Sequence, residues 1–565
     1  MFSIRKLGAI GRTYRHLNRY RRILRVLFKY GFADLVEGLH VDQYLETGLR
    51  MINRKPREHI EKKSRPERLR MAMEELGPTF IKLGQLLSTR PDFVAPAYLS
   101  ELAKLQDDVP PFPAEAVDEI FFAETGKTPG DLFQSFEEQP LAAASIGQVH
   151  RAILFDGSEV VVKVQRPDIE EVIAVDLEIL AHIASLMEQY LEEVQGHRPT
   201  VIVEEFARSL AREIDYTVES FNVQRFARQF EGNPAIYVPA IYSDLCTERI
   251  LVMEYVNGVK VSHLETLRQQ GADLRLLAER GANLIMEQIF VHGFFHADPH
   301  PGNITILPDN VVCFLDFGMM GRLGRKDCED FSDLVFYIVD RNERKVTESV
   351  LKLTIQYDEV DRAALGRDLG ELLDRYVYLP LKQLEAGKIL QDLLHLVSHH
   401  KLYFKPDLYL MMKALATVEG VGLMLDPDLE LLRLAEPFMR KVKSNRMRPS
   451  RLAEEAGITG SEYLKLIRGL PEELGSIMSQ LRGGRLKVEI EHSGLDLLRS
   501  ALDQVSNRIA FAIVLASLII GSSLIVLSGI PPKWNGIPVI GLFGFLFAGI
   551  MGFWLLISII RHGRM

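Results

Sequence analysis

Two long apolar runs near the C-terminus dominate the hydrophobic pattern of the chain. Residues 509–530 and 537–560 contain no charged side chain, and each run is long enough for a helix to cross a hydrocarbon core of about 30 Å. The residues between them, 531–536, predict a tight turn whose Trp534 suits a membrane interface. We therefore predict a transmembrane helical hairpin with spans at 508–530 and 537–560.

Small and basic residues in and around these runs refine the prediction. Gly544, Ala548 and Gly552 recur every four residues, a spacing that favours packing onto the first span or dimerisation, without choosing between them. The basic residues that flank the hairpin are Arg499, Arg508, Arg561, His562 and Arg564. By the positive-inside rule, both ends of the hairpin and the body of the protein lie on the cytoplasmic side.

Basic and apolar residues also interleave in the first forty residues, which contain no acidic residue before Asp34. Residues 1–70 carry a charge balance of +11 in a chain whose net charge is −9. Three interpretations compete: a helix on a surface of anionic lipids, a mitochondrial transit peptide, and a nucleic-acid arm. We favour the lipid surface and predict no nucleic-acid partner, because no other feature supports one.

The pattern between the termini indicates a mixed α+β body. Residues 159–165 largely alternate polar and apolar side chains and predict a strand with one buried face. Residues 202–226 predict one helix, residues 251–258 a strand that runs into a turn, and residues 311–315 a short strand. The stretch from about 330 to 505 is mostly helical by periodicity, with one further short strand at 486–491.

The strongest chemical signal is the sequence His-Ala-Asp-Pro-His-Pro-Gly-Asn at 296–303, followed by Asp-Phe-Gly at 316–318. The spacing of Asp298 and Asn303, with Asp316 after the next strand, is typical of phosphoryl-transfer enzymes. We expect Asp298 to orient or deprotonate an acceptor, and Asn303 and Asp316 to bind Mg²⁺ on nucleotide phosphates. The alternative is a loop rich in His and Asp with a structural role alone.

Such a site also needs a strand lysine and a helix carboxylate that holds it. Lys163 lies on the predicted strand, and Glu213, Asp215, Glu219 and Asn222 lie on the predicted helix 202–226. Asp215, Glu219 and Asn222 share one helix face, whereas Glu213 is rotated away from Glu219. We expect one carboxylate to pair with Lys163 and the others to face the metal. Taken singly, each of these residues could equally be solvated.

Two parts of an ordinary kinase site are missing from the sequence. Instead of a glycine-rich loop, residues 140–149 contain Ala142, Ala143, Ala144 and Ser145, whose Cβ atoms predict a stiffer loop that holds nucleotide differently. After Gly318 only seven residues precede the next helical pattern, so a long activation segment is absent. This absence argues against a peptide substrate.

These motifs together resemble the UbiB family of atypical kinases, also called the ADCK family, including its signature Lys-x-Gly-Gln at 82–85. The resemblance implies an α+β, protein-kinase-like two-lobe fold whose N-terminal helical extension packs over the site and blocks peptides. It implies that Lys163 pairs with Glu219 and that Lys82 and Gln85 point into the site. It also implies an ATP-dependent activity, hydrolysis or an atypical kinase reaction, tied to ubiquinone biosynthesis.

The expected organisation is a basic membrane-proximal segment at 1–40, a helical extension at 41–135, an N-lobe at 136–258, a C-lobe at 259–445, a helical linker at 446–507 and the hairpin. The expected catalytic residues are Asp298, Lys163 and Glu219. The expected ATP/ADP-binding residues are Ala142, Ala143, Ala144, Ser145, Lys163, Glu254, Lys82 and Gln85. The expected Mg²⁺ residues are Asn303, Asp316, Glu213 and Asp215.

The leading hypothesis is a membrane-anchored ATPase or atypical kinase that acts on or near an isoprenoid quinone precursor, with anionic lipids and quinone-biosynthesis proteins as partners. A phosphotransferase for another acceptor and a nucleotide-binding scaffold without catalysis are the alternatives. Three cysteines without metal-ligand spacing indicate a reducing compartment. We place the protein in a bacterial inner membrane, with the mitochondrial inner membrane as the alternative and a homodimer through the spans as an option.

Overall fold

The computed structural model describes residues 9–38, 62–88, 90, 93–105, 109–191, 198–356, 360–377, 385–446, 495–534 and 537–562. The chain divides into two units, residues 1–454 and residues 455–565, and each is described by itself. Most of the linker predicted at 446–507, including its strand at 486–491, lies outside the described residues.

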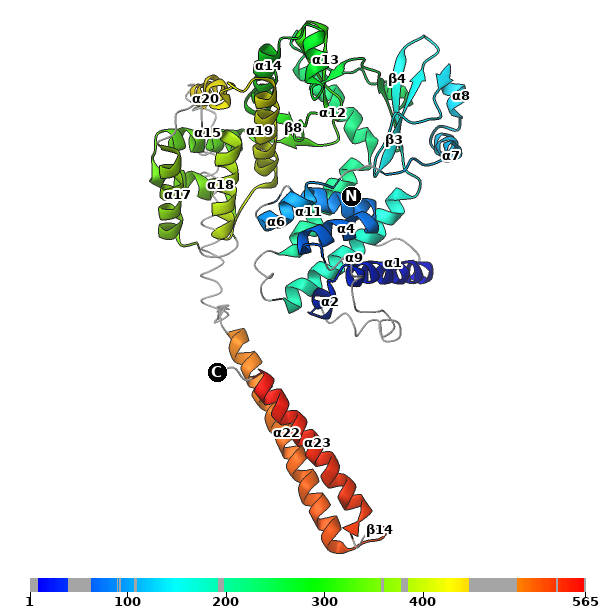
Figure 1. Cartoon of the computed structure of the whole chain (residues 1–565), viewed down its shortest axis with the longest axis vertical. Coiled ribbons are helices and arrows are strands. Elements are labelled where there is room, and N and C mark those ends of the chain that lie inside the picture. The colour runs from blue at the N-terminus through cyan, green and yellow to red at the C-terminus, as the bar shows by residue number, and fades with distance from the viewer. Residues whose placement is uncertain are drawn as a thin grey trace, which may run out of the picture. The chain divides into compact units, whose positions relative to one another are not determined.

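An antiparallel sheet forms the N-lobe of the first unit (Figure 1). Its strands follow the order β1 (Ser135–Phe136), β3 (Gly147–Ile153), β4 (Glu159–Gln165) and β6 (Ile250–Glu254), and β2 (Ala142–Ala143) also pairs with β3. On β4, Val160, Val162 and Val164 are fully buried against α7 (Ala114–Thr125) and its neighbours. Because side chains alternate along a strand, Lys163 points to the opposite face.

A helical layer packs beside this sheet and is built from two separate parts of the sequence. Its first part comprises α1 (Ala9–Lys29), α2 (Ala33–Gly38), α4 (Arg65–Leu76), α5 (Pro78–Ser88) and α6 (Pro96–Leu102). Its second part, α9 (Ile169–Tyr190) and α11 (Pro199–Glu213), follows β4 and shares one hydrophobic cluster with the first. The extension therefore includes α9 and α11, which the sequence analysis places in the N-lobe.

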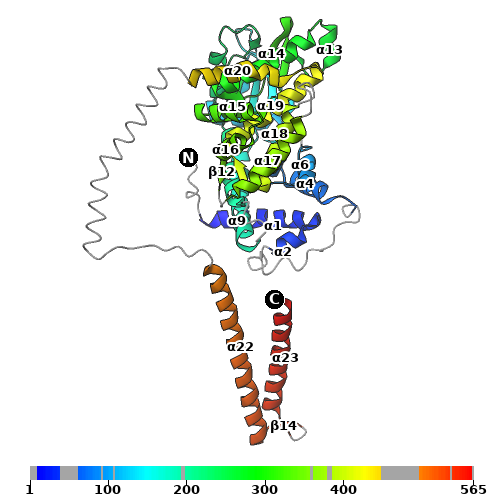
Figure 2. The ribbon, with the colours of Figure 1, turned by 90° about the vertical axis from the view of Figure 1, so that its left-hand side faces the viewer.

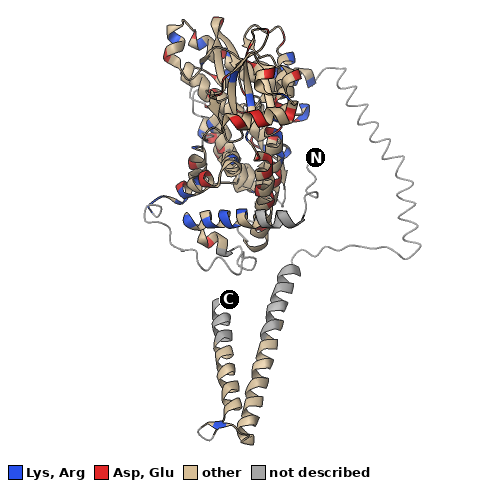
Figure 3. Cartoon of the chain, turned by 90° about the vertical axis from the view of Figure 1, so that its right-hand side faces the viewer, with Lys and Arg blue, Asp and Glu red and all other residues tan. Residues whose placement is uncertain are grey.

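Helix α1 uses its apolar face inside the protein. Ile23, Leu24 and Phe28 are buried against the helical layer, and Arg19 forms an ion pair with the fully buried Asp176 at 2.6 Å. The outward side carries Arg21, Arg22 and Arg25, so basic residues follow one another along α1 in Figure 3. The described part of α1 thus leaves a charged surface rather than an apolar one for a partner.

The single helix predicted at 202–226 is wrong. Helix α11 ends at Glu213, and α12 (Tyr216–Gln229) begins after Asp215, whose side chain caps it by accepting a hydrogen bond from the Thr217 N–H at 3.0 Å. The chain turns here because α11 buries its apolar face in the helical layer, whereas α12 packs Phe226 into the C-lobe. An Asp is well suited to start the second helix.

The C-lobe is mostly helical, and α14 (Leu274–Glu287) and α19 (Pro406–Leu425) pack together at its centre. Its other helices are α13 (Leu264–Gln269), α15 (Arg325–Val339), α16 (Glu343–Leu353), α17 (Arg362–Val377), α18 (Ala386–His399) and α20 (Leu431–Arg446). A small sheet has the order β5 (Ile236–Tyr237), β10 (Val311–Phe314), β9 (Ile304–Leu307) and β7 (Val259–Lys260). Only a short strand, β11 (Met320–Arg322), separates Gly318 from α15, as the sequence predicts.

The second unit is a pair of helices, α22 (Leu495–Ser528) and α23 (Val539–His562), which lie side by side (Figure 2). A Cβ atom added to Gly544 would come within 2.1 Å of the Ser522 Oγ, and one added to Gly541 within 2.6 Å of a Val526 methyl. The predicted small-residue stripe therefore lets the two helices approach each other. Packing of the stripe onto the first span is thus observed, and a homodimer through the spans stays a prediction.

Two described helices are long and apolar enough to cross a membrane, Pro406–Leu425 and Ile509–Ser528. The first is mostly buried and is the core helix α19 of the C-lobe. The second exposes most of its apolar side chains, and so does the part of α23 whose side chains are described, residues 539–553, where Phe543 is 66% exposed. An apolar surface of this extent is unusual on a protein that faces water.

Candidate active site

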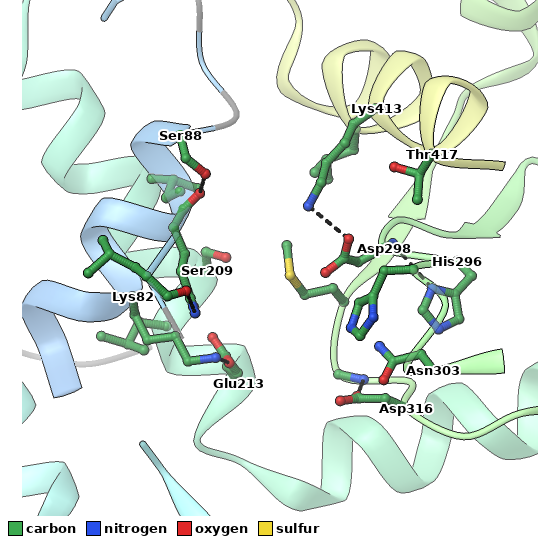
Figure 4. Close-up of a pocket in the computed structure, with 18 of the residues that line it drawn as sticks. Lys82, Ser88, Ser209, Glu213, His296, Asp298, Asn303, Asp316, Lys413 and Thr417 are labelled. Atoms are coloured by element: carbon green, nitrogen blue, oxygen red, sulfur yellow. Dashed lines mark hydrogen bonds and ion pairs between the residues drawn. The ribbon is translucent and has the colours of Figure 1, made fainter. Parts of the chain in front are cut away.

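A cavity of about 1050 Å³ lies where the extension, the two lobes and the 296–303 loop meet (Figure 4). Helices α5 and α11 form one wall, strands β3 and β4 line the cavity from the N-lobe, and α18 and α19 form the wall beside the loop. Its polar lining residues include Lys82, Gln85, Ser145, Lys163, Glu213, Tyr216, Glu219, His296, Asp298, Asn303, Asp316 and Lys413. Most of the residues predicted for the site are thus brought together.

The strand lysine has the carboxylate partner that the family resemblance implies. The Nζ of Lys163 lies 2.5 Å from the Oε1 of Glu219 and 3.9 Å from the Oδ1 of Asp316. The Phe317 N–H donates a second hydrogen bond to Glu219 at 3.3 Å. Helix α12 therefore links the lysine of the N-lobe to the Asp-Phe-Gly turn of the C-lobe.

Electrostatics favours the charged forms of Lys163 and Asp316. Burial lowers the pKa of the Lys163 ammonium, but the charges of Asp316 and Glu219 outweigh burial and raise it. The same ammonium lowers the pKa of Asp316 to about 2, although burial acts the other way. Burial raises the pKa of Glu219 and outweighs the opposing charge of Lys163, and the charge of Asp316 raises it further.

The hairpin of β9 and β10 places Asn303 beside Asp316. Asn303 directly precedes β9 and Asp316 follows β10 closely, and Ile304 pairs with Phe314 at the same end of the hairpin. The Leu315 N–H closes this end by donating to the Asn303 carbonyl at 3.0 Å. Figure 4 shows both side chains at the floor of the cavity. Their spacing in the sequence is therefore set by the length of one hairpin.

The Asp-Phe-Gly turn is also anchored from α12. The Asn222 amide donates to the Phe317 carbonyl at 3.0 Å, and the Gly318 N–H donates to the Asp316 Oδ1 at 2.9 Å. Glu219 and Asn222 do share one face of α12, as predicted, but Asn222 supports the turn rather than the cavity. The orientation of the Asp316 carboxylate is thus fixed before any ligand binds.

The signature Lys-x-Gly-Gln lies on α5 and faces the cavity. Lys82 forms an ion pair with Glu213, and the Gln85 amide donates to the Leu105 carbonyl at 3.3 Å. Gly84 has no room for a side chain, because a Cβ atom there would lie 2.2 Å from a Leu105 methyl and 2.8 Å from the Met73 sulfur. Close packing inside the extension, which requires this glycine, therefore fixes the helix that carries Lys82 and Gln85.

Several predicted site residues lie elsewhere. Ala142 and Ala143 pair with Val149 and Gln148 in the sheet, so only Ala144 and Ser145 of the predicted loop line the cavity. The Glu254 side chain accepts hydrogen bonds from the Tyr237 hydroxyl at 2.7 Å and the Ala240 N–H at 3.0 Å, outside the cavity lining. Asp215 is also outside it, because it caps α12.

The residues present fit a magnesium nucleotide better than a resident metal. No cluster of three His, Cys, Asp or Glu side chains occurs among the described residues, and Glu213 is engaged by Lys82. Mg²⁺ on a nucleotide needs only one or two protein oxygens beside the phosphates and water, which Asp316 and Asn303 can supply. The Ser145 hydroxyl, fully buried in the cavity wall, has no hydrogen-bond partner among the described residues and is available to a ligand.

One functional residue was missed by the sequence reasoning. Lys413 of α19 extends toward the loop, and its Nζ lies 3.0 Å from the Asp298 Oδ1. Asp298 is held further by its own N–H, which donates to the Nδ1 of the buried His296 at 3.2 Å. The sequence feature that could have indicated this residue is a lysine that is the only charged side chain in the run 408–418.

The fold and the cavity define the class of the protein as kinase-like, with a nucleotide site covered by a helical extension. Family models agree along the chain: an ABC1 atypical kinase-like domain matches residues 104–350, a UbiB helical domain 369–430, and an ABC1/UbiB kinase-like C-terminal domain 493–561. The chain belongs to the ABC1/UbiB family of atypical kinases.

Several bacterial relatives are similar over most of their length. An uncharacterized protein from the hydrogenase 1 5′ region of Clostridium pasteurianum is 33% identical and covers 97% of this chain and 99% of its own. Two proteins named "Probable protein kinase UbiB" are also similar. The one from Shewanella baltica is 32% identical over 91% of this chain and 94% of its own, and the one from Pectobacterium carotovorum is 36% identical over 76% and 79%.

Proposed function

We propose that this protein is a membrane-anchored atypical kinase or ATPase that binds Mg-ATP and supports ubiquinone or related isoprenoid quinone biosynthesis. One observation carries the enzymatic part: Lys163, Glu219, Asp316 and Asn303 converge on one cavity and are oriented before ligand binds. Preorganised charge of this kind is the main contribution that a protein makes to phosphoryl transfer.

Each residue has a definite role in this proposal. Bound Mg-ATP supplies the phosphoryl group and the cation that neutralises its charge. Lys163 binds the phosphates, and Asp316 and Asn303 hold the cation. Asp298 orients the acceptor, water or a hydroxyl, and accepts its proton. Glu219 keeps Lys163 in place rather than touching the nucleotide.

The shape of the cavity supports a lipid-like acceptor rather than a peptide. Helix α5 of the extension forms one wall of the cavity, and only β11 lies between Gly318 and α15, so no long activation segment is present to bind an extended chain. Apolar side chains line both walls of the cavity: Leu86, Phe206 and Leu210 from α5 and α11, and Leu390, Leu394 and Leu410 from α18 and α19. Apolar walls with few polar groups are typical of sites for apolar ligands.

The hairpin and α1 support a place at the membrane. The hairpin exposes apolar side chains along both helices, and α1 presents Arg21, Arg22 and Arg25 outward, as an anionic lipid surface requires. Positive residues at both ends of the hairpin favour a cytoplasmic body. The similar proteins are bacterial, which favours the bacterial inner membrane over the mitochondrial one. Quinone-biosynthesis proteins are the proposed protein partners.

Phosphate release from ATP tests the proposal. The purified full-length protein is assayed with Mg²⁺, with and without cardiolipin-containing vesicles and a phenolic mimic of a quinone precursor, and D316N is the control. We expect turnover that rises with vesicles and mimic and is abolished in D316N. If the protein binds nucleotide without turnover, the result would favour a nucleotide-binding scaffold over an enzyme. Turnover that D316N retains would refute the assigned site.

A further inference from the structure

An ammonium group from the C-lobe core reaches the loop that holds the proposed acceptor carboxylate. Lys413 lies in the middle of α19, and its Nζ contacts the Asp298 Oδ1 at 3.0 Å. The two side chains are 22% and 29% exposed, so the pair is largely withdrawn from water. Figure 4 shows Lys413 and Asp298 pointing toward each other across the cavity wall.

Position on α19 makes this lysine unusual. Its neighbours Met412 and Ala414 are fully buried, and the helix is one of the two at the centre of the C-lobe. Glu419 of the same helix is engaged elsewhere, because it accepts hydrogen bonds from the N–H groups of Ala386 and Gly387. A charge withdrawn from water on a core helix costs free energy unless it is paired, so Lys413 is kept for its partner.

Three ion pairs line the cavity, and Asp316 lies near the first of them. Lys163 pairs with Glu219, Lys82 pairs with Glu213, and Lys413 pairs with Asp298. The first two pairs join structural layers, but the third involves the carboxylate proposed to receive the acceptor proton. The loop 298–303 contains no Lys or Arg of its own, so α19 supplies the cation next to this carboxylate.

We propose that Lys413 is a positioning residue that acts through Asp298. This inference rests on the proposed function. Lys413 holds Oδ1, which leaves Oδ2 for the acceptor O–H. In the reaction the acceptor oxygen bonds to the γ-phosphorus, the bond from that phosphorus to the ADP oxygen breaks, and the acceptor proton moves to Asp298. Misplacing the carboxylate slows this step without weakening ATP binding.

A merely structural role makes a different prediction. If Lys413 only tied α19 to the loop, its loss would lower the melting temperature and slow the enzyme whatever stands at position 298. If it acts through Asp298, its loss matters only while the carboxylate is present. A double-mutant cycle separates the two, because residues that work as a unit are not additive.

The test compares K413M, K413R, D298N and K413M/D298N in the full-length protein. K405M is the matched control: Lys405 caps the same helix and pairs with Asp327 at 2.6 Å, outside the cavity. Phosphate release gives kcat and KM for ATP, and thermal unfolding monitors the fold. We expect K413M to lower kcat by about 10- to 100-fold with KM for ATP within about twofold. K413R should recover part of this loss, and K405M should retain wild-type kinetics.

In the D298N background, K413M should change the residual turnover by less than about twofold. Equal losses in both backgrounds, a loss confined to KM, or wild-type kinetics in K413M would overturn the inference. If K413M unfolds at a lower temperature than K405M, the cycle is repeated with K413Q. The glutamine side chain can donate only a weak hydrogen bond to Asp298. Turnover that needs Asp316 but is indifferent to Lys413 refutes this inference alone, whereas absent turnover refutes the proposed function as well.

Discussion

Replacing Lys163 by methionine tests whether the ion pair at the centre of the site is as tightly built as the geometry indicates. The substitution keeps the length and volume of the side chain but removes the charge. It leaves Glu219, only 7% exposed, without its partner 2.5 Å away, although the Phe317 N–H still donates to it. Removing one partner of a buried ion pair costs about 3–5 kcal/mol of unfolding free energy. We expect a value near the low end, because that N–H remains.

The loss should depend on pH in a definite direction. Without Lys163, burial and the charge of Asp316 both raise the pKa of Glu219, and only the Phe317 N–H opposes them. A carboxyl whose folded-state pKa is raised destabilises the fold as pH rises above its unfolded pKa, so the K163M deficit shrinks as pH falls. One pKa unit corresponds to about 1.4 kcal/mol, so lowering the pH from 7.5 to 5.5 recovers at most about 2.7 kcal/mol.

Urea unfolding of the full-length protein followed by far-UV circular dichroism measures this difference between variant and wild type. Tryptophan fluorescence is unsuitable, because both tryptophans, Trp534 and Trp554, are in the hairpin. K163M/E219Q is the matched control: with both charges removed, we expect a smaller deficit and no pH dependence beyond that of the wild type. A K163M deficit that is the same at both pH values, or undiminished in the double variant, would refute the reasoning.

Three further predictions concern other parts of the molecule. In G147A the added Cβ would lie 2.4 Å from the Tyr216 hydroxyl and 2.5 Å from a backbone oxygen. We therefore expect the unfolding free energy, measured with urea, to fall by about 1–3 kcal/mol and ATP binding to weaken. Wild-type values for both would contradict the packing. G544L should lower the melting temperature in detergent, whereas G549L, where a Cβ has open space, should not; equal effects would count against the hairpin contact. Burial lowers the pKa of His150, so this residue leaves the stability unchanged well above pH 6.5 and costs up to about 1.4 kcal/mol per pH unit as pH falls below it. H150Q should therefore show a flatter stability profile in urea titrations between pH 7.5 and 5, and an unchanged profile would contradict this.

Local spacing made much of the site predictable. Asn303 and Asp316 meet because they bracket one β-hairpin, and a hairpin leaves a regular distance in the sequence. The strand that carries Lys163 was predicted because its alternation reflects a single buried face. Motifs of this kind can be read directly, since the same short element sets both the spacing and the geometry.

Long-range packing hid the rest. The break at Asp215 is invisible to periodicity, because apolar residues continue on both sides of it but are buried in different cores. Nothing local indicates that α9 and α11 join the extension or that Lys413 reaches Asp298 from a distant helix. Glu254 was assigned to the nucleotide from its strand position, yet its side chain is taken by Tyr237 on another strand. In each case the partner is determined by the assembled fold.

We propose that Lys163, Asp316 and their neighbours form a site for a magnesium nucleotide. Calorimetric titration of the purified full-length protein with ATP, with and without Mg²⁺, tests it most directly. We expect that the wild type binds ATP only with Mg²⁺ and that this binding is lost in both K163M and D316N. Binding that is equally strong in the wild type and the two variants would contradict it.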